Sequence, residues 1–106
     1  MISNKANLVI EQGSTFNAVV ILSGDIGNTA WQSRSHIRKH YQSTNFYVLT
    51  TNVVGSNLTL NMTATDTAAM QAGRYVYDIE MIDEANTVYR ILEGTVTVTP
   101  EVTKTA

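Results

Sequence analysis

The sequence predicts an all-β fold, an antiparallel β-sandwich of about seven or eight short strands with one short helix before the last strands. Two observations lead to this prediction. Apolar and polar residues alternate with a period of two along several segments, which places them on opposite faces of a strand. Short turns separate these segments, and no long helical segment alternates with them. Such spacing is typical of a sandwich or a small barrel.

Four strands are expected in the first half of the chain. Residues 7–11 and 15–22 are apolar segments separated by a Gln-Gly-Ser turn. Residues 30–40 alternate between Trp, Ser and Ile on one side and basic residues on the other. Residues 45–52 are rich in aromatic and β-branched residues, which favour strands.

A fifth strand and the only helix follow. Residues 58–63 alternate three apolar residues with three polar ones, as a strand with one buried face does. Residues 66–73 form the best helical candidate, because Ala residues favour helix. Asp66 is expected to cap its N-terminus and Gly73 to end it.

A three-stranded meander over residues 72–82, 87–92 and 94–99 completes the predicted fold. Its first strand has the cleanest alternation in the chain, and its apolar face is made of Tyr75, Tyr77, Ile79 and Met81. We expect this face to be buried opposite Trp31 and Ile37. The other face carries charged side chains.

The composition fits a single domain over residues 1–106, with residues 1–6 and 101–106 as extended termini. The absence of cysteine excludes disulfides and thiolate chemistry. A net charge of -2 argues against a nucleic-acid partner. No apolar run approaches the ~20 residues that span a bilayer, and the N-terminus lacks a signal-peptide core. We therefore expect synthesis in the cytoplasm and no membrane partner.

Basic side chains gather on the polar face of the third strand: Arg34, His36, Arg38 and His40. A patch for phosphate or an acidic partner is one interpretation, and a zinc site would need further ligands. We favour ion pairs across neighbouring strands, because Asp78 and Glu80 have the matching spacing. Arg34 and Arg38 are therefore expected to pair with these carboxylates.

The acidic residues Asp78, Glu80, Asp83 and Glu84 could be read as a calcium site or an acid–base pair. No glycine-containing calcium loop accompanies them, and no nucleophile elbow, phosphate loop or zinc-protease motif is present. The sequence therefore predicts a protein that is not an enzyme and has no cofactor or metal.

Interface candidates come from two uncharged apolar segments expected at sheet edges: Leu8, Val9 and Ile10, and Thr95, Thr97 and Thr99. Such edges pair readily with a strand of another chain. Aromatic residues near the end of the third strand offer a second contact surface: Tyr41, Phe46 and Tyr47.

Two segments of the C-terminal half, 66–80 and 90–103, resemble small structural domains of tailed bacteriophages and prophages. They are most similar to the β-sandwich module at the N-terminus of phage baseplate upper proteins, and residues 24–38 fit that pattern more loosely. The helical turn before Tyr75 and Tyr77 also resembles the corner of immunoglobulin-like sandwiches, without the disulfide. This resemblance implies an immunoglobulin-like antiparallel β-sandwich with the short helix before the penultimate strands.

The resemblance to the phage domains implies a non-enzymatic virion subunit of the tail or baseplate that contacts other virion proteins and forms a homo-oligomer or part of a larger assembly. The chain ends after one module, which argues against host recognition and for an accessory role. Two alternatives remain open: a capsid decoration protein, and a carbohydrate-binding module or small hydrolase.

Overall fold

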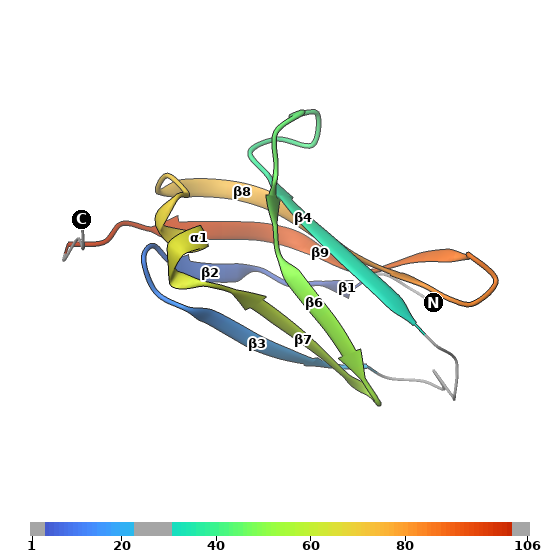
Figure 1. Ribbon diagram of the computed structural model, residues 1–106. Helices are drawn as coiled ribbons and strands as arrows, with labels where there is room; N and C mark the ends of the chain where they lie inside the picture. Colours follow the sequence, from blue (N-terminus) through green and yellow to red (C-terminus); the bar gives the residue numbers. More distant parts are fainter. Residues whose placement is uncertain (1–3, 23–30, 103–106) are drawn as a thin grey trace.

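The structure, a computed structural model, describes residues 4–22 and 31–102 as two packed β-sheets (Figure 1). Sheet A contains β1 (Asn4–Lys5), β2 (Leu8–Glu11), β4 (Gln32–Arg38), β5 (Tyr47–Val48), β8 (Gly73–Ile82) and β9 (Val88–Thr99). Sheet B contains β3 (Phe16–Ile21), β6 (Thr50–Val54) and β7 (Asn57–Met62), and the helix α1 spans Ala64–Ala68. The predicted all-β sandwich with one short helix is confirmed. No helix in the described part of the chain is long and apolar enough to cross a membrane.

Sheet A departs from the purely antiparallel arrangement that the sequence predicts. Its order is β1-β9-β8-β4-β5, and β2 also pairs with β9. β8 runs antiparallel to both of its neighbours, but β1 and β2 run parallel to β9. The N-terminal segment therefore closes one side of this sheet, and residues 4–6 are not simply an extended terminus.

Sheet B is antiparallel, in the order β3-β7-β6, with a hairpin between β6 and β7 and with β3 beside β7. The single strand expected over residues 45–52 is in fact two strands in different sheets, because the chain crosses between them at the buried residue Leu49. The Leu49 amide still donates to the Ser35 carbonyl of β4 at 3.2 Å. The hydroxyls of Ser33 and Thr51 lie 2.7 Å apart and join the two sheets.

The two last strands of the expected meander are one continuous strand, β9, with Gly94 in its interior. Gly94 is needed there for close packing, because a Cβ at this position would collide with the Ala6 carbonyl oxygen. An irregularity in the β8–β9 pairing follows Ile79, so that both Ile91 and Leu92 are buried.

The helix begins earlier than predicted and has a different cap. The Thr63 hydroxyl accepts from the Asp66 amide at 3.2 Å, so Thr63 rather than Asp66 is the N-cap. Gly73 does not end the helix but begins β8. Its φ of +146° is a backbone conformation that residues with a side chain rarely adopt. The buried Thr67 hydroxyl donates to the Ser14 carbonyl at 2.8 Å and holds the helix against the β2–β3 turn.

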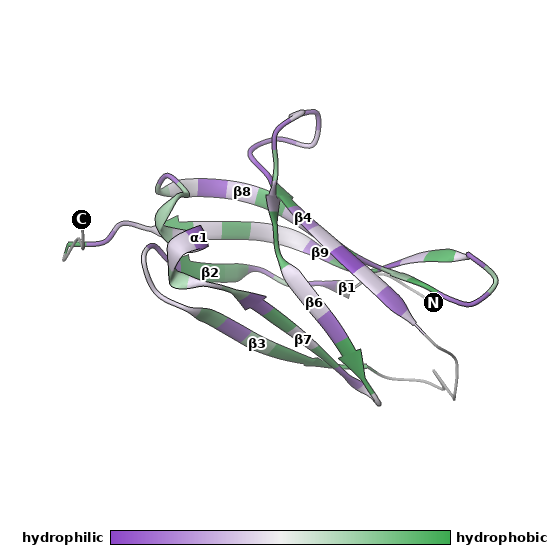
Figure 2. Ribbon diagram, in the orientation of Figure 1, coloured by the Kyte–Doolittle hydropathy of each residue, from purple (hydrophilic) through white to green (hydrophobic). Residues whose placement is uncertain are grey.

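The core lies between the sheets and is built from alternate residues of the strands (Figure 2). As predicted, the apolar face of β8 is buried: Tyr75, Tyr77, Ile79 and Met81. Ile37 lies in register with Tyr77. Trp31 is partly buried against the core and contacts Tyr89 edge to face, with ring centroids 5.8 Å apart.

The N-terminal segment is held to sheet A by Ala6. The Ala6 amide donates to the Glu93 carbonyl at 2.9 Å, and the Tyr77 hydroxyl donates to the Ala6 carbonyl at 2.8 Å. Burial raises the pKa of Tyr77 to about 12. The Tyr77 side chain is therefore in its neutral phenol form in the folded protein.

Replacement of Ile79 by alanine is expected to lower the free energy of unfolding by about 2–5 kcal/mol, because it leaves a cavity at a fully buried site. Ile21→Ala is the matched control, since Ile21 is 71% exposed, and it should change stability by less than about 0.5 kcal/mol. Urea melts measure both values. Equal losses in the two variants would show that the face assignment of β8 is wrong.

The pKa of Tyr77 also predicts how stability depends on pH. The unfolded phenol ionises near its ordinary pKa of about 10, whereas the folded one stays neutral up to about 12. The stability contribution of this group is therefore present below pH 10 and lost between pH 10 and about 12. Chemical denaturation gives the free energy of unfolding at pH 9 and at pH 11.5. The decrease between these two pH values should be smaller in Tyr77→Phe than in the wild type. Tyr41→Phe, at an exposed position, should retain the wild-type loss.

Candidate functional site

The outer face of sheet A carries a hollow of about 400 Å³ whose sides are charged. The strands β4, β8 and β9 contribute to it, and paired residues of these strands form two rows of side chains at its centre. The first row is Arg34, Glu80 and Arg90, and the second row is His36, Asp78 and Glu93. We call these six residues the charged hollow. Their alternation with buried residues turns them all away from the core.

Ion pairs fix the arginines of the charged hollow. Arg34 Nε donates to Glu80 Oε1 at 2.7 Å, so Arg34 pairs with one of the two carboxylates that the sequence predicts. Arg90 lies between two carboxylates, with Nε 3.5 Å from Asp78 Oδ2 and one terminal nitrogen 3.7 Å from Glu93 Oε2. Donors and acceptors therefore alternate across the hollow.

Asp78 occupies the middle of this arrangement, opposite His36 on β4 and Glu93 on β9. Burial raises the pKa of its carboxyl group above the ordinary value, and the charges of Glu80 and Glu93 add to the effect, while Arg90 and His36 oppose it. The Asp78 carboxylate is thus partly desolvated while its side chain stays 39% exposed, so a ligand donor could reach it and form a charge-assisted hydrogen bond.

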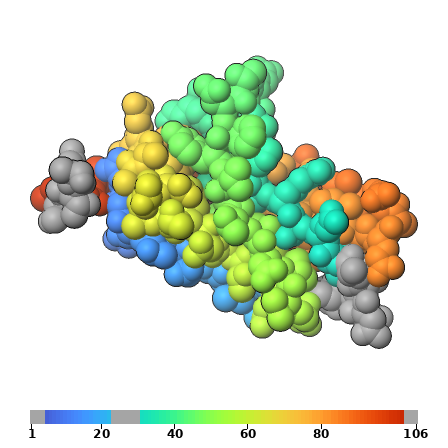
Figure 3. All heavy atoms as spheres, in the orientation of Figure 1, coloured from blue at the N-terminus to red at the C-terminus, as the bar shows by residue number. Residues whose placement is uncertain are grey.

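Arg38 does not pair with Asp78 or Glu80, and that prediction is wrong. It lies opposite Val76, and its guanidinium donates to the Ser43 carbonyl at 2.5 Å and to the Thr44 carbonyl at 3.3 Å. Its role is to hold the loop of residues 39–46, which projects from the body of the sandwich (Figure 3).

This loop forms one wall beside the charged hollow. The Phe46 ring stacks on His36, with centroids 3.8 Å apart, and Arg38 lies 4.8 Å from the Phe46 centroid. Tyr41, which lines the hollow, is 77% exposed. Tyr47 instead points into the sandwich and contacts Tyr75 edge to face, with centroids 6.0 Å apart. Of the three predicted aromatic contact residues, Tyr41 and Phe46 lie at the surface.

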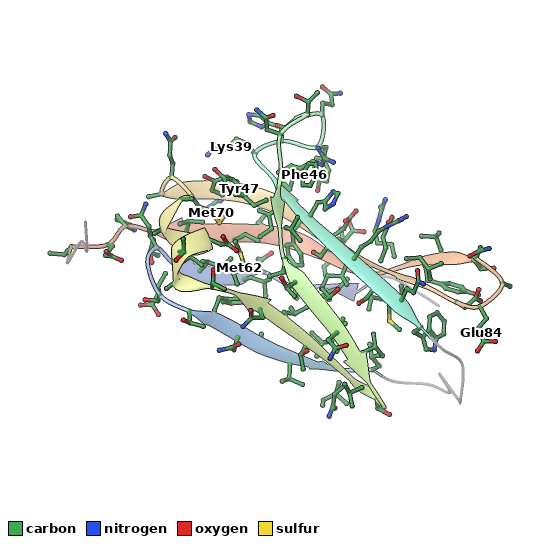
Figure 4. The ribbon with its side chains drawn as sticks, in the orientation of Figure 1. Lys39, Phe46, Tyr47, Met62, Met70 and Glu84 are labelled. Carbon is green, nitrogen blue, oxygen red and sulfur yellow. The ribbon has the colours of Figure 1, made fainter. Side chains whose placement is uncertain are left out.

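The remaining charged candidates lie elsewhere. His40 falls in the turn after β4, where its amide donates to the Ser43 hydroxyl. Asp83 organises the β8–β9 turn by accepting from the Ala85 and Thr87 amides, both at 2.9 Å. Glu84 lies at the tip of this hairpin, far from Phe46 (Figure 4). Within residues 4–22 and 31–102, no group of His, Asp and Glu is placed to hold a metal ion.

The expectation that residues 95–99 form a free sheet edge is wrong. β9 is flanked by β8 on one side and by β1 and β2 on the other, so Thr95, Thr97 and Thr99 offer no open backbone. The prediction that Leu8, Val9 and Ile10 lie at a sheet edge is confirmed, because among the described residues β2 pairs only with β9, as Leu8 with Val96 and Ile10 with Val98. Val9 points outward and is 59% exposed.

Sequence reasoning missed Arg90 and Glu93. Both lie on the outer side of β9 although they are three residues apart, a spacing that strict alternation would place on opposite faces. Their meeting with Asp78 depends on the irregular register after Ile79, which shifts the pairing of β9 by one residue. No local pattern in the sequence revealed that shift.

No family model and no curated protein sequence matches the chain. Among solved structures it is similar to a putative glycoside hydrolase from Bacteroides vulgatus ATCC 8482, with a TM-score of 0.54 and 12% identity over 89% of this chain and 16% of that one. It also matches the 2,6-sialyltransferase of Vibrionaceae Photobacterium sp. JT-ISH-224, with a TM-score of 0.46 and 16% identity over 94% of this chain and 18% of that one. The chain thus spans less than a fifth of either protein, and the likeness concerns the fold.

The predicted function, a structural subunit of a phage virion in the tail, baseplate or capsid, is corrected by this comparison. The similar structure with a TM-score above 0.5 is that of a putative glycoside hydrolase, and its description does not mention a virion. The resemblance to the phage module is therefore carried no further.

The Arg34–Glu80 pair should contribute about 0.2–1 kcal/mol to stability, because both side chains contact solvent. A double-mutant cycle with Arg34→Met and Glu80→Gln should measure this coupling, and 0.5 M salt should reduce it. The matched cycle with Arg38→Met and Glu80→Gln should give no coupling, since Arg38 faces the 39–46 loop. Equal couplings in the two cycles would contradict the observed register.

Proposed function

We propose that the chain is a non-catalytic binding module whose ligand is a carbohydrate, held in the charged hollow. The observation that carries the proposal is the combination in one concave site of alternating guanidinium donors and carboxylate acceptors with an exposed aromatic ring at the rim. Ligand sites in proteins are typically concave, with a few fixed polar groups that determine orientation.

Sugar hydroxyls suit this arrangement because each can donate and accept a hydrogen bond. The Asp78 carboxylate would accept from one hydroxyl, and Arg90 would donate to a neighbouring one. Ion pairs already hold both side chains, so little side-chain entropy is lost when a ligand binds. Tyr41 supplies a flat apolar surface for the C–H groups of a sugar ring.

The same contacts favour binding over catalysis. Glu80 is held by Arg34, and Asp78 lies next to Arg90, so each carboxylate has a cationic partner. An acid–base pair needs one carboxyl group that stays protonated at working pH; burial raises the pKa of Asp78 in that direction, but the charge of Arg90 opposes the shift. The fold similarity to a small part of a glycoside hydrolase is compatible with an accessory module in a carbohydrate-processing protein.

Titration with a panel of hexoses, N-acetylhexosamines and pentoses, as mono- to trisaccharides, tests the proposal. Amide chemical shifts of the ¹⁵N-labelled chain should change saturably on β4, β8 and β9, with a dissociation constant of about 0.1–1 mM for at least one sugar. Absence of any saturable shift, or shifts confined to sheet B, would refute the proposal.

For a sugar that binds, Asp78→Asn should weaken binding by about 10–100-fold, as loss of a hydrogen bond to a charged group does. Glu84→Gln is the matched control: it removes one carboxylate at the hairpin tip and should leave affinity unchanged (Figure 4). Equal affinities for the wild type and Asp78→Asn would show that the Asp78 carboxylate does not bind the ligand.

A further inference from the structure

Charge is distributed unequally between the two sheets. The three strands of sheet B contain no charged residue, whereas β1, β2, β4, β8 and β9 of sheet A all contain at least one. The outer face of sheet B also exposes large apolar side chains: Val19 at 59%, Ile21 at 71% and Val54 at 61%. Soluble proteins usually protect such strands with charges or proline.

The strand β3 forms an open edge of this sheet. It pairs only with β7, and the described residues place no strand on its other side. Just after β3, the Leu22 amide donates to the Ser56 carbonyl, which lies just before β7. The even-numbered residues of β3 therefore direct their N–H and C=O groups toward β7. Because direction alternates along a strand, Asn17, Val19 and Ile21 direct their N–H and C=O groups to the open edge.

We propose that this edge binds a second copy of the chain, with the two β3 strands antiparallel about a two-fold axis at Val19. In this register Val19 pairs with the partner copy's equivalent residue, and Asn17 pairs with Ile21 in both directions. All six open backbone groups then form hydrogen bonds. With the axis at Ala18 or at Val20 instead, one residue of each outer pair would lie beyond the ends of β3, which spans Phe16–Ile21.

A second copy matches this edge better than an unrelated strand for two reasons. The edge carries no charge with which to select an oppositely charged partner, and its own sequence is equally uncharged. The two-fold axis also brings Val19 and Ile21 of both copies together on the outer face, where they cover one another's exposed apolar surface. The inference is independent of the proposed carbohydrate site, which lies on the other sheet.

Sedimentation equilibrium of the full chain tests the proposal. The contact is small, so we expect a dimer that dissociates over roughly 10 μM to 1 mM. Val19→Lys should make the chain monomeric throughout this range, because two lysines would meet at the axis. Val54→Lys places the same charge at similar exposure on β6 and should dimerise like the wild type. A monomeric wild type, or equal loss of dimer in both variants, would overturn the proposal.

A second test uses disulfide formation and introduces no charged residue. The natural chain has no cysteine. Directly opposed residues in a hydrogen-bonded antiparallel pair have Cα atoms about 5.5 Å apart, which a disulfide can span. Val19→Cys should therefore form a covalent dimer on mild oxidation, and Val54→Cys should form no covalent dimer under the same conditions. Cross-linking of both variants, or of neither, would contradict the β3 pairing.

Discussion

The register of β8 between β4 and β9 is the constraint on which both the core and the charged hollow depend. Period-two alternation turns Tyr77 and Ile79 inward and Asp78 and Glu80 outward. A slip of one residue would exchange the two faces and bury the carboxylates, so the apolar face determines where the charges lie. The ion pairs of the hollow are a consequence of this register, and their own energy is too small to set it.

The N-terminal segment completes sheet A on the far side of β9. It adds parallel strands to β9 and covers an edge that would otherwise be open. Gly94 lets the Ala6 backbone approach β9, and the buried Tyr77 hydroxyl bonds to the Ala6 carbonyl. Tyr77 thus connects the core to the segment that completes sheet A.

The two outer faces of the sandwich differ in chemistry, and this difference suggests a division of roles. Sheet A presents paired charges beside an aromatic loop, which suits a small polar ligand. Sheet B presents an uncharged face and the open edge of β3, which suits another protein strand. Since the two surfaces belong to different sheets, occupation of one leaves the other accessible.

The sequence by itself determined the sandwich class, the buried face of β8 and the outward direction of Arg34 and Glu80, because each follows from alternation along single strands. Tertiary structure alone decided the rest. The parallel docking of β2 on β9, the passage of the chain between sheets at Leu49 and the approach of Arg90 to Asp78 join residues distant in sequence. They depend on backbone register and close packing, which leave no periodic signal in a single sequence.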